Sequence, residues 1–289
     1  MNYRHDFHAG NFADVFKHAV LARILEYLKR KPAPFRVIDS HAGSGRYDLV
    51  AEAAVRTQEW RAGIGRLDSD AMEAEARALL SPYLAVVGAA RNGGALYPGS
   101  PALALALTRP LDRLIFCELH PDALAALRAC VGLDRRAKVV ALDGYTGLKA
   151  FIPPVERRGL LLVDPPFEAP DEFERLTTAL VAAHEKWREG IVMAWYPIKD
   201  WRIGERFAAA LADAGIADAL RIELAIAAPA ANGALAASGL VVVNPPYVLE
   251  AEAACLLPAL ARQLAPGEGR VFIGKIGEPR RAAKGARAR

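Results

Sequence analysis

The sequence contains little cysteine, and its three cysteines, Cys117, Cys130 and Cys255, form no CxxC pair. A sparse, odd set argues against the disulfide framework of a small secreted protein. The early histidines include an HxxH pair at His5 and His8, but this is not a standard zinc spacing and no cysteine accompanies it. We therefore expect a reduced, cytoplasmic protein with no bound metal.

The chain also lacks an obvious membrane or export segment. Its first residues, MNYRHDFHAG, have no apolar stretch of the kind found in signal peptides. Residues 224–249 carry no charge and are long enough to span a bilayer, but proline, asparagine, glycine and serine interrupt them. Two β-segments joined by a turn explain this stretch better, so we expect no membrane association.

Excess charge of one sign is confined to the end of the chain. Residues 278–289, EPRRAAKGARAR, hold five basic residues and one acidic residue, which leaves 32 of each sign elsewhere. We predict one domain over residues 1–277 and a disordered basic tail over 278–289. Two roles for the tail remain open, a merely solvated end and an arm that contacts phosphates.

Short apolar segments alternate with amphipathic ones along most of the chain. This alternation predicts an α/β fold of the doubly wound, Rossmann-like type, with a mostly parallel sheet and an antiparallel hairpin near its end. Residues 50–95 interrupt it and read as a small helical insertion, while 1–16 and 97–101 read as loops. The predicted strands cover residues 35–40, 111–119, 137–143, 159–163, 190–198, 221–228, 238–243 and 270–276, and the predicted helices cover 16–30, a segment from 47, a segment from 102, 121–131, 144–152, 171–187, 201–214 and 251–264.

The stretch LLLVDPPF, residues 160–167, combines a buried strand with a polar turn. Two prolines stop the strand, and neither has an N–H, so the turn offers only acceptors, the Asp164 carboxylate and the Pro165 carbonyl. Phe167 places a flat apolar face beside them. Acceptors next to a stacking surface suit the exocyclic amino group of a planar base. The alternative, in which Asp164 only caps the next helix, remains open.

Three other strands end in candidate binding residues. A turn with Gly43 and Gly45 follows the first strand, Glu118 ends the next, and Asp143 ends the one after it. The turn lacks both the GxGxxG dinucleotide fingerprint and the GK[S/T] of a phosphate loop, and it could be only a tight connection. However, Glu118 can accept the hydroxyls of a ribose and Asp143 an adenine amino group. This set fits S-adenosylmethionine, a nucleoside without phosphates, better than NAD.

A second segment, GLVVVNPPY at residues 239–247, repeats the pattern of the first. The pattern alone does not distinguish the two. If residues 239–243 belong to an antiparallel hairpin, however, Asn244 lies at the opposite edge of the sheet. We therefore predict that Asn244 is a turn residue and that Asp164 is the functional one.

The motifs together resemble the bacterial 23S ribosomal RNA adenine-N6 methyltransferase J family. The resemblance covers nearly the whole chain up to Ile276, and the N-terminal motif is its most specific part. The family commonly has DPPY, so Phe167 is a departure that preserves stacking but lacks a hydroxyl. The matching segments are YRHDFHAGNFADVFKH (3–18), HAGSGRY (41–47), YPGSP (97–101), ELHP (118–121), DG (143–144) and DPPF (164–167).

The resemblance implies a fold, a reaction and a set of site residues. It implies an S-adenosylmethionine-dependent methyltransferase fold, and a monomer that methylates the N6 amino group of one adenine in 23S ribosomal RNA, either naked or in an early assembly particle. Asp164 would be the catalytic acceptor, with Pro165 and Phe167 beside it. Tyr3, His5 and Lys17 would bind or position the RNA. With the glycine turn included, the expected cofactor-binding residues are His18, His41, Gly43, Ser100, Glu118, Asp143, Gly144 and Asp164.

Two other classes of function remain open. One is an amino-methyltransferase that acts on DNA adenine or on protein glutamine. The other is a non-catalytic RNA-binding protein of the same fold, against which the intact Asp164 and Glu118 argue.

Overall fold

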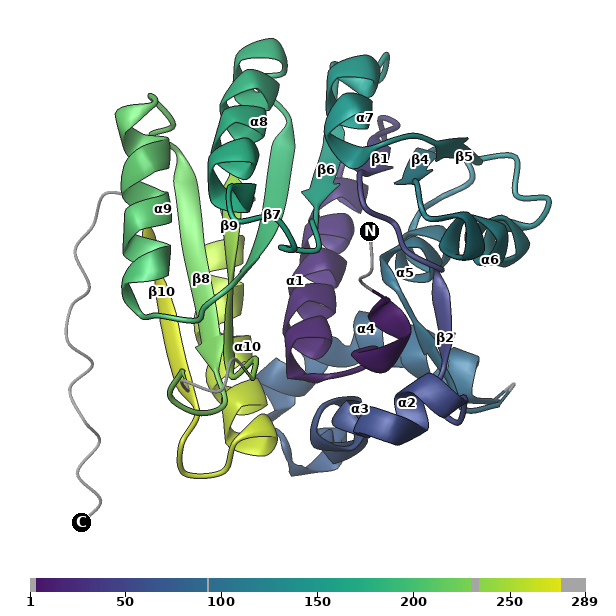
Figure 1. The fold of residues 1–289 in the computed structure, drawn as a ribbon, viewed down its shortest axis with the longest axis vertical. Coiled ribbons are helices and arrows are strands. Elements are labelled where there is room, and N and C mark those ends of the chain that lie inside the picture. Colours follow the sequence, from purple (N-terminus) through teal and green to yellow (C-terminus); the bar gives the residue numbers. More distant parts are fainter. Residues whose placement is uncertain (1–3, 93, 230–233, 277–289) are drawn as a thin grey trace.

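The computed structural model describes residues 4–92, 94–229 and 234–276. The predicted basic tail and Tyr3 lie outside these ranges. Within them, an eight-stranded sheet has the order β10-β8-β9-β7-β6-β1-β4-β5 (Figure 1). The strands are β1 (Arg36–Asp39), β4 (Arg113–Glu118), β5 (Ala137–Ala141), β6 (Gly159–Val163), β7 (Ile191–Pro197), β8 (Ala219–Ala225), β9 (Ala237–Val243) and β10 (Arg270–Lys275).

Strands β7, β6, β1, β4 and β5 run parallel to one another. Strand β9 is antiparallel to both β7 and β8, and β10 is antiparallel to β8. The predicted mostly parallel sheet with an antiparallel hairpin is therefore confirmed. From β1 the sheet continues through β4 and β5 on one side and through β6 and β7 on the other. Ligands bind in open α/β sheets at such a change of direction in the strand order.

Helices cover both faces of the sheet (Figure 1). One hydrophobic cluster joins the sheet to α1, α5, α6 and α10, and a second joins the other face to α7, α8 and α9. This gives three layers with the sheet in the middle. The helices are α1 (Phe12–Lys29), α5 (Ser100–Leu107), α6 (Pro121–Val131), α7 (Gly144–Phe151), α8 (Glu172–Lys186), α9 (Arg202–Asp213) and α10 (Leu249–Leu264).

The prediction of a surface loop over residues 1–16 is wrong from Phe12 onward, because α1 already begins there, and residues 1–3 lie outside the described ranges. The side chain of Asn11 caps the helix by accepting the N–H of Asp14. Fifteen of the eighteen residues of α1 are buried. Such a helix has no polar face, so the sequence shows no amphipathic pattern that would mark the residue where the helix begins.

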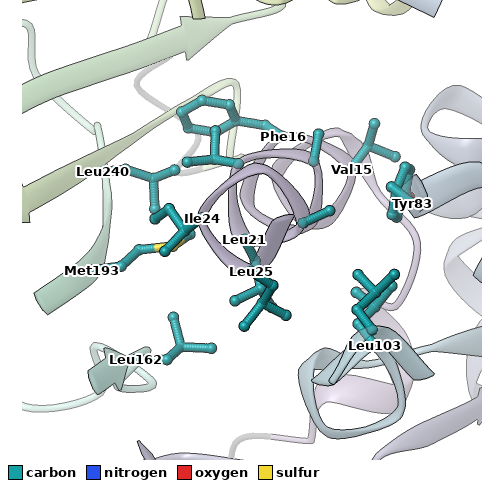
Figure 2. Close-up of a cluster of buried hydrophobic side chains, with 14 of the residues drawn as sticks. Val15, Phe16, Leu21, Ile24, Leu25, Tyr83, Leu103, Leu162, Met193 and Leu240 are labelled. Atoms are coloured by element: carbon teal, nitrogen blue, oxygen red, sulfur yellow. The ribbon is translucent and has the colours of Figure 1, made fainter. Parts of the chain in front are cut away.

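The position of α1 explains why most of its residues are buried. In Figure 2, its side chains lie between Leu162, Met193 and Leu240 of the sheet on one side and Tyr83 and Leu103 on the other. Tyr83 and Leu103 belong to α4 (Ala74–Asn92) and α5. The helix is thus held between the sheet and the segment that interrupts the α/β alternation.

That interrupting segment is helical, with α2 (Glu52–Thr57), α3 (Glu59–Ala62) and α4, and with 3-10 turns at Ile64–Arg66 and Ser69–Ala71. The prediction that a helix starts at residue 47 is wrong, because the first helix after the glycine turn, α2, begins at Glu52. Arg46–Asp48 is instead a short strand, β2, which pairs antiparallel with β3 (Leu96–Pro98). The predicted loop at 97–101 is therefore part strand and part helix, since α5 starts at Ser100.

The uncharged stretch near residue 230 is a hairpin of β8 and β9 in its described parts. Among the described residues, no helix is long and apolar enough to cross a membrane.

Candidate functional site

A cavity of about 790 Å³ lies where β1, β4, β5 and β6 end. All of the catalytic, substrate-binding and cofactor-binding residues expected from the family resemblance that lie within the described ranges line it. The cavity therefore brings together segments separated by more than one hundred residues in the chain. The predicted residues on its wall are His5, Lys17, His18, His41, Gly43, Ser100, Glu118, Asp143, Gly144, Asp164, Pro165 and Phe167.

Asp164 follows directly after β6, whose residues are all buried. Its side chain is 18% exposed, and the carboxylate reaches the cavity from the carboxyl end of β6. Phe167 closes the motif with φ of 50°, in the left-handed region that non-glycine residues rarely adopt. Strain of this kind persists where the surroundings hold it, and here it turns the aromatic ring toward the cavity.

Trp195, which the sequence reasoning missed, lies beside the motif. Its ring meets that of Phe167 edge to face, with the centroids 5.8 Å apart. Both rings line the cavity. Trp195 is inside β7, which is paired with β6, so only knowledge of the strand order could have placed it here.

Lys17 connects α1 with Asp164. Its Nζ lies 2.5 Å from Oδ2 of Asp164 and 2.9 Å from Oδ1 of Asp14, and only 6% of its side chain is exposed. Burial alone would lower the pKa of Lys17, but Asp14 and Asp164 outweigh that effect and raise the pKa above its ordinary value. The ammonium therefore stays charged and is shared by two carboxylates.

Asp14 is the second site residue that the sequence reasoning missed. Its Oδ2 accepts from the backbone N–H of Gly10 and contacts His5 Nε2, both at 2.9 Å. Burial alone would raise the pKa of Asp14, yet the contacts with His5 and Lys17 hold it well below its usual range. Asp14, Lys17 and His18 have the i, i+3, i+4 spacing of one helix face. A helix predicted from Phe12 would have grouped them.

His18 and His41 are neutral at ordinary pH. Burial lowers the pKa of His18 to about 3 and that of His41 to about 4. Each ring has a hydrogen-bond partner at Nδ1, the Tyr97 hydroxyl for His18 and the Ser40 hydroxyl for His41, both at 2.8 Å. The two imidazoles therefore line the cavity as oriented, uncharged groups.

The Glu118 carboxylate is held in place by backbone N–H groups. Gly43 donates to its Oε2 at 2.8 Å, and Leu119 and His120 donate to its Oε1 at 2.8 and 2.7 Å. Gly43 itself has φ of +62°, which suits glycine. Three donors fix the carboxylate at the cavity wall, where its remaining lone pairs can accept hydroxyl groups.

Asp143 and Gly144 form the start of α7. Asp143 Oδ1 accepts from the N–H and the hydroxyl of Thr146, at 3.0 and 3.1 Å, and so caps this helix. At Gly144, a Cβ atom would lie 2.4 Å from Nε2 of His41. The glycine thus allows His41 to pack against the helix start.

Asn244 lies away from this cavity. Because β9 is antiparallel to β7, the end of β9 lies beside the start of β7, with Val243 opposite Val192. The Asn244 amide donates to the carbonyls of Arg188 and Gly190 at 2.6 and 2.8 Å. The prediction that NPPY faces the opposite edge of the sheet is confirmed.

The residues of the cavity fit S-adenosylmethionine by the chemistry of their donors and acceptors. The anchored Glu118 can accept ribose hydroxyls, Asp143 can accept an amino group, and the glycine turn leaves room for a close approach. The volume lies within the usual range for ligand pockets, about 300–1,000 Å³. In the part of the chain that the structure describes, no group of three His, Cys, Asp or Glu side chains could hold a metal ion.

This chain is similar to known proteins over most of its length. The family model described as "Ribosomal RNA large subunit methyltransferase D, RlmJ" matches residues 32–274. Ribosomal RNA large subunit methyltransferase J from Escherichia coli is 41% identical over 280 residues, which is 96% of this chain and 99% of its own length. Its namesake from Haemophilus influenzae is 38% identical over 271 residues, covering 92% and 95%. Among solved structures, protein LPL1258 from Legionella pneumophila has a TM-score of 0.84 at 33% identity, covering 94% of this chain and 99% of its own.

Proposed function

This chain belongs to the RlmJ family of ribosomal RNA large subunit methyltransferases, and we propose that it methylates the N6 amino group of an adenine in 23S ribosomal RNA, using S-adenosylmethionine. The proposal rests on one observation. The same cavity is lined by Glu118 and by the turn residues Asp164, Pro165 and Phe167. Acceptors and a stacking ring suit the adenine, and an anchored carboxylate suits the ribose of the cofactor.

Several residues would hold the cofactor. Glu118 would accept the ribose hydroxyls, Asp143 the adenine amino group, and Gly43 and Gly144 would let the ligand approach the backbone. His18, His41 and Ser100 complete this end of the cavity. When bound, S-adenosylmethionine supplies the electrophilic methyl group.

Asp164 and Pro165 activate the accepting amino group. The N6 lone pair of adenine is delocalised into the ring, so the free amine is a poor nucleophile. Hydrogen bonds from its N–H groups to the Asp164 carboxylate and the Pro165 carbonyl raise its electron density. Positive charge develops on N6 as the methyl group passes from the sulfonium sulfur to nitrogen, and a fixed carboxylate stabilises that charge. The sulfur leaves as a neutral thioether, and N6 then loses one proton to solvent. Lys17 contacts Oδ2 of Asp164, so we assign Oδ1 to the amino group.

Phe167 and Trp195 receive the base. An adenine in a helical stem must leave its stack to reach a cavity at the carboxyl ends of these strands. Stacking on Phe167 replaces part of the stacking that the base loses, by roughly 1–3 kcal/mol. The strained φ of Phe167 keeps the ring oriented before the base arrives.

Transfer of a labelled methyl group tests this function directly. Purified protein is incubated with labelled S-adenosylmethionine and, separately, with 23S RNA freed of protein, with DNA and with a translation release factor. We expect label only in the RNA, recovered after digestion as N6-methyladenosine. Label in DNA or protein would identify the other amino-methyltransferase class, and no transfer to any substrate would indicate a non-catalytic RNA-binding protein.

We also propose that the substrate is 23S RNA that is naked or in an early assembly particle, and that the protein is a cytoplasmic monomer. The substrate proposal rests on access, because a base can leave its stack more easily before the subunit is complete. The proposal of a cytoplasmic location rests on the three cysteines, which are free thiols. Comparing methylation of naked RNA, precursor particles and finished 50S subunits tests the substrate. Sedimentation and cell fractionation test the other two proposals.

A further inference from the structure

Asp14 has no role in the function proposed so far, although it is among the most buried charged residues of the cavity wall. Its side chain is 2% exposed. It contacts the N-terminal segment through His5 and the Gly10 N–H, and α1 through Lys17. Lys17 in turn contacts Asp164. Asp14 is therefore one residue removed from the group that would accept the adenine amino group.

The cluster contains the Asp14 and Asp164 carboxylates and the Lys17 ammonium, and the His5 imidazole contacts Asp14 at 2.9 Å. His18 lies 4.0 Å from Asp14 Oδ1 but is neutral, because burial lowers its pKa to about 3. Asp14 and Asp164 thus share the Lys17 ammonium. In a buried site, a cation that paired with Asp164 alone would offset more of the negative charge of the Asp164 carboxylate. The carboxylate would then be a weaker hydrogen-bond acceptor.

We infer that Asp14 is a positioning residue that holds part of the Lys17 charge away from Asp164 and so preserves the acceptor strength of Asp164 during methyl transfer. The contact at 2.9 Å gives the Lys17 ammonium a second carboxylate partner besides Asp164. The Gly10 N–H and His5 fix Asp14 itself. This inference rests on the proposed function, because it needs Asp164 to accept the amino group.

The test variant is Asp14→Asn, which keeps the shape and an oxygen for the Gly10 N–H but removes the charge. We expect kcat to fall about 10- to 100-fold at saturating RNA and cofactor, with both KM values within about threefold of wild type. A loss confined to kcat marks an interaction that acts in the transition state. Wild-type kcat in this variant would overturn the inference.

Asp112→Asn is the matched control. Asp112 is also fully buried, pairs with an arginine, Arg109, and accepts the backbone N–H of Phe35, but it does not line the cavity. Both variants should unfold at a lower temperature, and only Asp14→Asn should lose kcat. Equal losses of kcat in the two would mean that Asp14 acts through stability alone.

A double variant tests whether Asp14 acts through Lys17. In a Lys17→Gln background the ammonium is gone, so adding Asp14→Asn should cause no further loss of kcat. Losses that multiply would overturn the inference. This comparison also applies if Asp14→Asn alone does not fold. Wild-type protein that fails to methylate RNA in the same assay would reject the proposed function instead.

Discussion

Lys17 and Asp164 are 147 positions apart in the chain, yet Nζ of Lys17 lies 2.5 Å from Oδ2 of Asp164. One residue comes from the buried helix α1 and the other from the turn after β6. The contact makes the N-terminal motif part of the same site as the DPPF turn. Because Lys17 contacts Oδ2, the proposed mechanism assigns the other carboxylate oxygen of Asp164, Oδ1, to the substrate.

Asp164→Ala should abolish methyl transfer. The variant loses the carboxylate that we propose as the acceptor for the N6 amino group, and we expect kcat to fall by roughly 10²–10³ or more. Cofactor affinity should change little, because Glu118 and Asp143 remain. Single-turnover rates and calorimetric titration with S-adenosylmethionine measure the two effects. Turnover close to that of wild type would rule out the proposed mechanism.

Asn244→Ala should leave turnover unchanged. The Asn244 amide binds two backbone carbonyls at the opposite edge of the sheet, so its loss affects folding. We expect a decrease in unfolding free energy of about 1–3 kcal/mol. Chemical denaturation and an activity assay below the melting temperature check both parts. A folded but inactive variant would show that the second motif is the functional one.

Phe167→Tyr should stay active, whereas Phe167→Ala should bind RNA poorly. Tyrosine keeps the stacking ring, and alanine removes about 1–3 kcal/mol of base stacking, which corresponds to a roughly 5- to 150-fold higher KM for RNA. Cofactor affinity is the internal control and should not change. An unchanged KM for RNA in the alanine variant would exclude a stacking role for this ring.

Glu118→Gln should weaken cofactor binding. The neutral amide can accept only through one oxygen, whereas Glu118 accepts three backbone N–H groups through two. Loss of a charged acceptor is typically worth 1.5–3 kcal/mol, so we expect the Kd for S-adenosylmethionine to rise by roughly 10- to 100-fold. At saturating cofactor, kcat should recover. A Kd equal to that of wild type would argue against Glu118 as a cofactor residue.

Asp39→Asn should change how stability depends on pH. Burial raises the pKa of Asp39 to about 7, so the folded protein keeps this proton where the unfolded chain has lost it. Asp39 therefore favours folding below about pH 4, and this contribution is lost as pH rises to about 7. Asparagine does not titrate, so the stability of the variant relative to wild type should increase from pH 5 to pH 8, by on the order of a few kcal/mol. Urea unfolding across this range is the measurement, and a constant difference would contradict the prediction.

Local sequence patterns were enough to predict most of the sheet and to single out the turn after β6 as the candidate for the reaction. Apolar runs such as Gly159–Val163 have a strand pattern that depends only on neighbouring residues, and the prolines at 165 and 166 end the strand wherever it lies. The residues at the ends of four such runs, among them Glu118 and Asp164, could be assigned to one edge because parallel strands share their direction.

Local patterns could not reveal the start of α1 or the strand β2. A helix buried on all sides shows no periodic polar face, so residues 12–15 resembled a loop. Arg46–Asp48 becomes a strand only because Leu96–Pro98 lies beside it. In both cases the deciding partner is distant in the chain.

Tertiary structure alone decided which side chains act together. The placement of Trp195 beside Phe167 follows from the pairing of β6 with β7, and the exclusion of Asn244 follows from the antiparallel direction of β9. The sharing of Lys17 by Asp14 and Asp164 follows from the burial of α1 against the sheet. The physical reason is the same in each case. A sequence pattern records the backbone preference and polarity of a segment, whereas a charge contact or a ring contact depends on the packing of segments that are far apart in the chain.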